Sequence, residues 1–261
     1  MRRLLLTGAG GKVGACLRNA LRERYEWVLT DQKEVGKSGS QPFYPADITD
    51  LAALRGLCEG IDTVVHCAAS SQLTAGWDEL LPNNIIGLYN ILQAATEGGC
   101  RRVILTSSYH VVFGYPAGQP VPLTWPAYPV NLYGASKVLG ESLASVFAHQ
   151  SALSIICLRL GAVKQAGELG VGQSILAEVI TYNDLIRLVI AAIEAPDTVR
   201  FGCFHGLSNN RHKRLDISET VRVLGYRPCD DAFALAWHNQ FSWVYWWRRV
   251  QQKFAQYGAW R

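Results

Sequence analysis

The chain begins with an apolar segment that runs directly into a glycine-rich turn, and this stretch limits the possible fold more than any other. Residues 4–14 read Leu-Leu-Leu-Thr-Gly-Ala-Gly-Gly-Lys-Val-Gly, and a helical pattern follows over residues 12–24. Gly8 allows a sharp turn out of a strand, Gly11 allows the backbone to approach a pyrophosphate, and Gly14 allows the helix to pack closely on the sheet. The free N–H groups at the start of such a helix attract an anion. The segment therefore predicts a dinucleotide site between a first strand and a first helix.

Apolar segments and helical patterns alternate through the first two-thirds of the chain. Buried parallel strands are predicted at residues 3–7, 27–30, 63–67, 103–106 and 154–158. Helices are predicted at residues 12–24, 51–58, 84–96 and 132–148. This alternation predicts an α/β fold, a Rossmann-type doubly wound parallel sheet that binds ligands at the carboxyl ends of its strands.

The last hundred residues differ in character from the rest of the chain. We expect residues 1–160 to form the dinucleotide-binding core and residues 161–261 to form a small region that covers the substrate, within one integrated domain. The glycine-rich residues 161–172 predict a long loop before a helix at residues 182–193. Residues 237–261 hold five tryptophans interleaved with Arg and Lys. They predict a helix whose rings cover the core or a subunit interface, and a helix lying on a membrane surface is the alternative.

Composition excludes several classes of protein. No apolar run reaches the roughly 20 residues that span a bilayer, so no integral membrane segment is expected. The net charge of +4 is mild, and there is no nucleic-acid-binding motif. Seven scattered cysteines, none in C-x-x-C spacing, indicate reduced thiols in a cytoplasmic protein and no metal site.

Acidic residues follow the second predicted strand and the short apolar segment after it. Asp31 lies about twenty positions beyond the glycines, where a carboxylate accepts hydrogen bonds from the adenosine ribose and opposes a 2′-phosphate. Asp31 therefore predicts NAD as the cofactor in preference to NADP. Lys12 and Lys33 are close to it in sequence, and their positive charges would favour a 2′-phosphate instead. Asp47 and Ile48 either contact the adenine or simply precede the next helix as its N-cap region.

Tyr133 and Lys137 have the spacing at which two side chains share one face of a helix. A phenol with a pKa near 10 is a poor base at neutral pH, but a neighbouring ammonium and a positive nicotinamide ring favour the phenolate. Tyr133 could then take the proton of a substrate hydroxyl while hydride leaves the same carbon. Ser107 and Ser108, at the end of the preceding strand, could hold the substrate oxygen. The pattern predicts an oxidoreductase.

Together these features resemble the extended, epimerase/dehydratase-like branch of the short-chain dehydrogenase/reductase superfamily. The resemblance rests on Thr7-Gly-x-x-Gly-x-x-Gly14, Asp31, Asp47-Ile48, His66-Cys-Ala-Ala69, Asn84, Ser108 and Tyr133-x-x-x-Lys137. It implies a catalytic set of Ser108, Tyr133 and Lys137. The cofactor-binding residues that it implies are Gly8, Gly11, Lys12, Val13, Gly14, Asp31, Asp47, Ile48, Ala68, Ala69, Asn84, Tyr133 and Lys137.

Within this branch the chain is similar to uronate dehydrogenases, which oxidise the C1 hydroxyl of a cyclic hexuronate. The likeness lies in residues 84–90, 108–110, 114–116, 132–137 and 224–228. About a hundred residues follow Gly161, too few for the lobe with which relatives clasp a nucleotide sugar. The likeness therefore implies NAD-dependent oxidation of a small sugar acid, aldose or polyol. The implied substrate contacts are Ser71, Ser108, Tyr109, His110 and Lys164.

The chain departs from this group at the substrate end. Tyr109 replaces an asparagine, Ala162 replaces a serine, and no arginine occurs between Arg159 and Arg187, where the group has one that grips the uronate carboxylate. Lys164 is the only cation in that loop, and a lone ammonium lacks the bidentate fork that suits a carboxylate. We therefore expect weak activity on glucuronate and galacturonate, and better activity on a neutral or differently charged hydroxyl compound.

Some alternatives remain open. His110 is either a substrate hydrogen-bond donor or a buried histidine held by its own surroundings. An epimerase or dehydratase that never releases its NAD, or a non-catalytic dinucleotide sensor, is the alternative to a dehydrogenase. The resemblance also implies a homodimer that pairs through the helices at residues 84–96 and 132–148. The apolar residues that these two helices are expected to contribute to the dimer interface are Ile85, Leu88, Leu92, Leu139 and Leu143.

Overall fold

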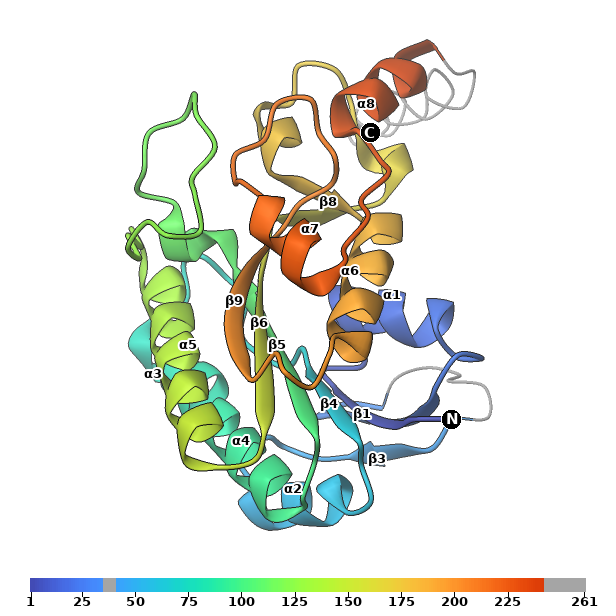
Figure 1. The fold of residues 1–261 in the computed structure, drawn as a ribbon, viewed down its shortest axis with the longest axis vertical. Helices are drawn as coiled ribbons and strands as arrows, with labels where there is room; N and C mark the ends of the chain where they lie inside the picture. Colours follow the sequence, from blue (N-terminus) through green and yellow to red (C-terminus); the bar gives the residue numbers. More distant parts are fainter. Residues whose placement is uncertain (35–40, 242–261) are drawn as a thin grey trace, which may run out of the picture.

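The computed structural model describes residues 1–34 and 41–241, which form a parallel sheet with helices on both faces (Figure 1). The seven strands lie in the order β3-β2-β1-β4-β5-β6-β9, and every neighbouring pair is parallel. The strands are β1 (Arg3–Thr7), β2 (Glu26–Asp31), β3 (Phe43–Pro45), β4 (Thr63–His66), β5 (Arg102–Ser108), β6 (Ser154–Leu160) and β9 (Phe201–Gly206). The chain winds outward in one direction from β1 to β3 and in the other from β4 to β9. This order confirms the predicted Rossmann-type sheet and puts the switch point between β1 and β4.

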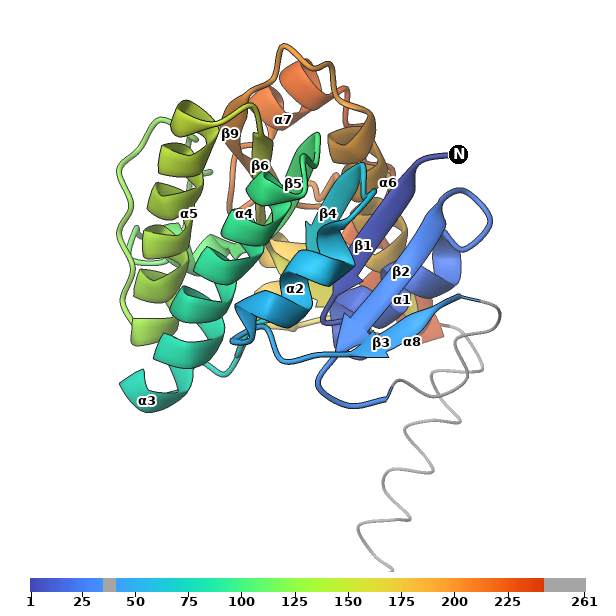
Figure 2. The ribbon, with the colours of Figure 1, turned by 90° about the horizontal axis from the view of Figure 1, so that it is seen from below.

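Helices cover both faces of the sheet, as Figure 2 shows from below. The helices are α1 (Lys12–Ala20), α2 (Leu51–Cys58), α3 (Trp77–Leu80), α4 (Gly87–Glu97), α5 (Leu132–Gln150), α6 (Tyr182–Glu194), α7 (Ser218–Leu224) and α8 (Ala232–Phe241). Alternate strand residues face opposite layers. Leu4 and Leu6 of β1 therefore pack with α1 and α6, whereas Leu5 packs with α2, α4 and α5.

The second of these cores corrects the expected dimer face. Leu88 and Leu92 of α4 are buried against the sheet, so they are not available to a second subunit. The apolar residues that α4 and the turn before it expose are instead Ile86 and Tyr89. A sequence period of 3.6 shows that a helix has an apolar face, but only packing shows which side of the helix the sheet covers.

The helix predicted at residues 84–96 begins earlier and has two geometries. A short α3 continues through a π-helical segment, Leu81–Ile86, into α4, so Asn84 lies in the π-helical part. Pro82 has no N–H to donate and is tolerated near the start of a helix. π-Helical turns within helices are frequent at functional sites.

Residues 161–172, which their glycines predict to be a long loop, contain a strand and a 3₁₀ turn. β7 (Ala162–Lys164) pairs in parallel with β8 (Val179–Thr181), with Ala162 opposite Val179, and two 3₁₀ turns, Ala166–Glu168 and Ser174–Glu178, lie between them. The prediction was wrong because this pairing joins residues seventeen positions apart, which no local pattern reveals.

The predicted aromatic helix at residues 237–261 is described only in part. α8 includes Trp237, which is exposed, and residues 242–261 fall outside the described part of the chain. Among the helices of residues 1–34 and 41–241, none combines the length and apolar character needed to cross a membrane.

Candidate active site

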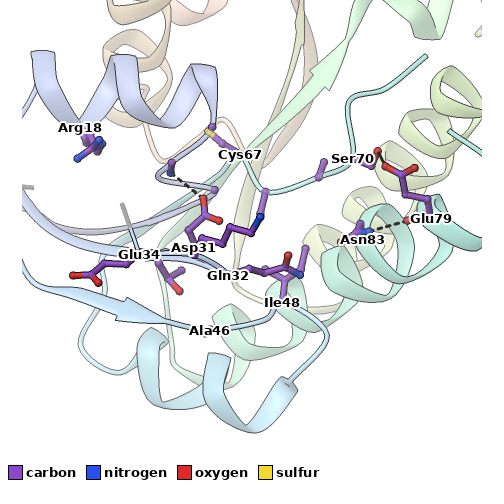
Figure 3. A pocket seen from close by; sticks show the side chains of 17 residues that line it. Arg18, Asp31, Gln32, Glu34, Ala46, Ile48, Cys67, Ser70, Glu79 and Asn83 are labelled. Atoms are coloured by element: carbon purple, nitrogen blue, oxygen red, sulfur yellow. Dashed lines mark hydrogen bonds between the residues drawn. The ribbon is translucent and has the colours of Figure 1, made fainter. Parts of the chain in front are cut away.

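Two adjoining cavities open where the strand order reverses. The larger, of about 560 Å³, is lined by the glycine turn, by Asp31 at the end of β2, and by Ala68 after β4 (Figure 3). The smaller, of about 350 Å³, is lined by the same glycine turn and by residues of β5 and α5. Residues that line both cavities are Gly8, Gly11, Cys67 and Ala69. The two cavities are therefore neighbouring parts of one elongated cleft.

The glycine turn has the geometry that a dinucleotide requires. Gly8 has φ +68°, a conformation that other residues rarely adopt. A Cβ on Gly14 would lie 2.1 Å from the carbonyl oxygen of Gly8, so only glycine lets α1 start so close to the turn. Lys12 and Val13, the first residues of α1, line the smaller cavity. The N-terminus of α1 thus points its free N–H groups at the middle of the cleft, where a pyrophosphate fits.

Asp31 and Ile48 line the larger cavity, as the sequence predicts for the adenosine end. The Oδ2 atom of Asp31 accepts a hydrogen bond from the N–H of Gly10 at 2.9 Å, the dashed line beside Asp31 in Figure 3. Asp47 does not line either cavity. Its carboxylate accepts hydrogen bonds from the backbone and hydroxyl of Thr49, both at 2.8 Å, which lower its pKa, and from Gln32, which does line the larger cavity. Asp47 therefore reaches this end of the cleft only through Gln32.

Ser108, Tyr133 and Lys137 come together on one wall of the smaller cavity. The side chain of Asn131 caps α5 by accepting a hydrogen bond from the N–H of Gly134 at 2.7 Å, which starts the helix just before Tyr133. The Tyr133 phenol lies close to Ser108, at the end of β5, and both residues line the smaller cavity. The Nζ atom of Lys137 lies 5.7 Å from the centre of the Tyr133 ring and donates to the carbonyl of Thr106 at 3.1 Å. A proton acceptor, a hydroxyl and an ammonium thus face one space.

Burial dominates the ionisation of this pair. It raises the pKa of the Tyr133 phenol, and the neighbouring Ser108 hydroxyl offsets only part of this effect. Burial also lowers the pKa of Lys137 to about 8. The sequence predicts that Lys137 promotes the phenolate. Burial thus disfavours the charged form of both groups, but Lys137 keeps its charge below pH 8. Tyr133 stays protonated near neutral pH, so further positive charge in the cleft is needed to ionise it.

Asn84 supports the cleft without lining either of the two cavities. Its Oδ1 atom accepts from the N–H of Ser70 at 2.8 Å, and its Nδ2 atom donates to the Ser70 carbonyl and to the Ser136 hydroxyl, both at 3.0 Å. These bonds join the segment after β4 to α5. Because Ser71 follows Ser70 and lines the smaller cavity, Asn84 holds in place the segment that carries Ser71.

Tyr109 and His110 line the smaller cavity beside Ser71, but Lys164 does not. The backbone N–H of His110 donates to the Ser108 hydroxyl at 3.2 Å, and its ring stacks on Phe113 with centroids 4.8 Å apart. His110 is therefore compatible with both interpretations. It is packed against its neighbours, as a structural histidine would be, and it also lines the cavity, where it could contact a substrate. The structure does not bring Lys164, the last residue of β7, to the place expected of it.

A buried ion pair lies next to the catalytic candidates. Glu141 lies one helical turn beyond Lys137, and its carboxylate accepts two hydrogen bonds from Arg159 of β6, at 2.9 and 2.8 Å. Its Oε1 atom also accepts from the Ser107 hydroxyl at 2.6 Å. Glu141 is not among the predicted site residues, although its spacing continues the Tyr133–Lys137 series. The ion pair ties β6 to α5, and the hydrogen bond from Ser107 ties the end of β5 to the same helix, so the two contacts fix the wall that holds Ser108.

The chain is similar in sequence and structure to several sugar dehydrogenases. The model of the NAD dependent epimerase/dehydratase family matches residues 4–181. An NAD-dependent glucose-6-phosphate dehydrogenase of Haloferax volcanii is 31% identical over 88% of this chain and 94% of its own length. An L-arabinose 1-dehydrogenase (NAD(P)(+)) of the same organism is 31% identical over 89% and 98%. The crystal structure of uronate dehydrogenase from Agrobacterium tumefaciens superimposes with a TM-score of 0.84, at 29% identity over 92% of this chain and 89% of that one.

Proposed function

Because this chain belongs to the NAD dependent epimerase/dehydratase family and is an NAD-dependent sugar dehydrogenase, we propose that it oxidises a hydroxyl carbon of a small sugar with Tyr133 as the general base. The observation that carries this proposal is the meeting of Ser108, Tyr133 and Lys137 in a cavity that shares the glycine turn with the cofactor end of the cleft. The cavity of about 350 Å³ suits a single sugar ring.

Different residues of the cleft have different roles in the proposed reaction. The glycine turn and Asp31 would hold NAD, which supplies the acceptor for the hydride when it is bound. Ser108 and Tyr133 hold the substrate hydroxyl between them, and Tyr133 takes its proton as the carbon is oxidised. Lys137, held by the Thr106 carbonyl, keeps a positive charge beside the phenol. Ser108 and Tyr133 are buried, which limits the access of bulk water to the reacting oxygen.

A screen for NADH formation across aldoses, uronates and cyclic alcohols tests the proposal. We expect at least one sugar to give stoichiometric NADH with excess NAD. Conversion of a sugar or nucleotide sugar without net NADH would instead show an epimerase or dehydratase. Absence of any conversion, with NAD binding intact, would show a dinucleotide-sensing protein.

Asp31→Ala is expected to weaken NAD binding by about tenfold and to narrow the gap between NAD and NADP. The carboxylate that holds the ribose hydroxyls is lost, and with it the repulsion of a 2′-phosphate. Isothermal titration of both cofactors measures the change. Glu23→Ala, which removes an exposed carboxylate of the loop after α1, should leave both affinities unchanged. Tighter binding of NADP than of NAD to the unaltered protein would contradict the assignment of Asp31.

We propose that two copies pair through α4 and α5, which lie side by side on one face of the sheet (Figures 1 and 2). Exposed apolar side chains from the start of α4 and from α5 supply the surface: Ile86, Tyr89, Leu139 and Val146. The expected result is a dimer by light scattering at micromolar concentration, converted to monomer by Leu139→Glu. Val221→Glu, at an equally exposed valine of α7, should leave the dimer intact. A monomer for the unaltered chain would remove this proposal.

We also place the protein in the cytoplasm. Its seven cysteines are free thiols, and four of them are buried. Unpaired buried cysteines are typical of proteins in a reducing compartment.

A further inference from the structure

Asn131 links the start of α5 to the ring of His110. Its Oδ1 atom accepts the hydrogen bond from the N–H of Gly134, at 2.7 Å, that caps the helix. An amide side chain has one oxygen and one NH₂ group, so this cap identifies the remaining polar atom of Asn131 as the nitrogen Nδ2. Nδ2 lies 3.3 Å from the Nδ1 atom of His110. The group of Asn131 that faces the imidazole is therefore a hydrogen-bond donor.

This contact determines which nitrogen of His110 carries the proton. The Nδ2 atom of Asn131 can only donate, so the Nδ1 atom of His110 accepts and is unprotonated. In a neutral imidazole the proton is then on Nε2. Burial lowers the pKa of His110, and within residues 1–34 and 41–241 no carboxylate is hydrogen-bonded to it. The ring is therefore neutral near pH 7, with its proton on Nε2.

The Nε2 atom of His110 is open to the smaller cavity. His110 is 6% exposed and lines that cavity beside Ser108 and Tyr133, with its ring centre 5.8 Å from that of Tyr133. No group in the described part of the chain is hydrogen-bonded to Nε2, although this atom is not sealed from solvent. The Nε2–H group can therefore donate to a ligand in the cavity.

The titratable groups around the ring carry no negative charge near neutral pH. The aromatic rings of Tyr109 and Tyr133 contact His110, and burial raises the pKa of both phenols. The nearby cations are Lys137 and Arg214, each of which lies over an aromatic ring that contacts His110. A carboxylate placed at position 131 would therefore add a negative charge where the described neighbours of the ring have none.

We infer that Asn131 is a positioning residue that fixes His110 as a hydrogen-bond donor toward the substrate, through the Nε2 atom. The substrate must then present an oxygen lone pair to His110, beside the hydroxyl that Ser108 and Tyr133 hold. The ring oxygen of a cyclic sugar meets this need, because it has lone pairs and no proton to donate. The same amide caps α5, so one side chain orients both His110 and the helix that carries Tyr133. This inference rests on the proposed function.

Asn131→Asp tests the inference because it keeps the cap and reverses the contact with His110. One carboxylate oxygen still accepts from Gly134, and the other can only accept, so Nδ1 of His110 must carry a proton. The adjacent negative charge also raises the pKa of His110. Above that pKa the neutral ring has its proton on Nδ1, and Nε2 no longer donates. Below that pKa both ring nitrogens are protonated, and Nε2 donates again.

We expect kcat/KM of Asn131→Asp, divided by that of the unaltered enzyme, to fall about tenfold between pH 6 and pH 9, the scale of one hydrogen bond. Taking the ratio at each pH removes the ionisation of Tyr133 that both enzymes share. Asn19→Asp adds the same charge at an exposed position, at the end of α1 away from the glycine turn. Its ratio should stay near one at every pH.

A spectroscopic measurement tests the tautomer without any substrate. Long-range ¹H–¹⁵N correlation spectra of the labelled, unaltered protein distinguish a proton on Nε2 from one on Nδ1. The signals of His110 are identified by their loss in His110→Gln. We expect the Nε2–H form in the unaltered protein and, at pH 9, the Nδ1–H form in Asn131→Asp.

The outcomes separate this inference from the proposed function. A kcat/KM ratio that is constant with pH overturns the inference alone, and so does a ratio that rises with pH, which is expected if the new charge acts only on Tyr133. An Nδ1–H tautomer of His110 in the unaltered protein has the same consequence. If no sugar yields NADH, the proposed function is overturned and the inference with it. Should Asn131→Asp fail to fold, the tautomer in the unaltered protein decides.

Discussion

Tyr133→Phe is expected to lower turnover by about 10² or more while leaving NAD binding within a few-fold, because the variant loses only the group that accepts the substrate proton. Steady-state kinetics with the best sugar from the NADH screen measures the first effect, and isothermal titration with NAD measures the second. Tyr128→Phe removes the hydroxyl of an exposed tyrosine and should change neither quantity.

The pH dependence gives the same prediction a second test. Burial raises the pKa of the Tyr133 phenol, so the base is mostly protonated at neutral pH and its ionised fraction grows as the pH increases. Oxidation should therefore accelerate from pH 6 toward pH 8, and more slowly above the Lys137 pKa of about 8, where the ammonium loses its charge. The residual activity of Tyr133→Phe should lack this rise. Near-normal turnover with an unchanged profile would show that another group is the base.

Arg159→Met is expected to lower the free energy of unfolding by about 3–5 kcal/mol. The substitution leaves the Glu141 carboxylate, whose side chain is 8% exposed, without the guanidinium that compensates its charge. Urea denaturation followed by circular dichroism measures the loss.

Two further variants show whether the loss comes from a stranded charge. The double variant Arg159→Met/Glu141→Leu should recover most of the stability, because apolar residues of similar volume can replace a buried ion pair at little cost. Arg222→Met removes one partner of the exposed pair with Glu219 and should cost no more than about 1 kcal/mol. A cost for Arg159→Met as small as that of Arg222→Met would mean that water reaches the Glu141 carboxylate in solution.

The positions of the catalytic candidates follow from short-range features of the chain. The positive φ of Gly8 and the close start of α1 at Gly14 are features of residues 8–14, and they give the glycine turn its shape. Tyr133 and Lys137 share a face because four residues make about one helical turn. The apolar runs of β1, β4, β5 and β6 predict buried parallel strands. The fold, and the cavity wall that carries Ser108, Tyr133 and Lys137, could therefore be predicted from local sterics, helical periodicity and strand burial.

The surroundings of that wall depend on contacts that no local pattern encodes. Glu141 and Arg159 meet because β6 lies under α5, and Ala162 lies opposite Val179 because β7 pairs with β8. Lys164 has the right charge for a substrate contact, yet the course of β7 keeps it off the cavity wall. The apolar face of α4 was recognisable, but the choice between Leu88 inside and Tyr89 outside came from how the helix packs on the sheet. The sequence by itself determined the fold and the catalytic candidates, because both arise from interactions within a few residues. Only the tertiary structure decided which charges and hydroxyls surround the substrate, because strand pairing and helix packing bring those groups together from distant positions.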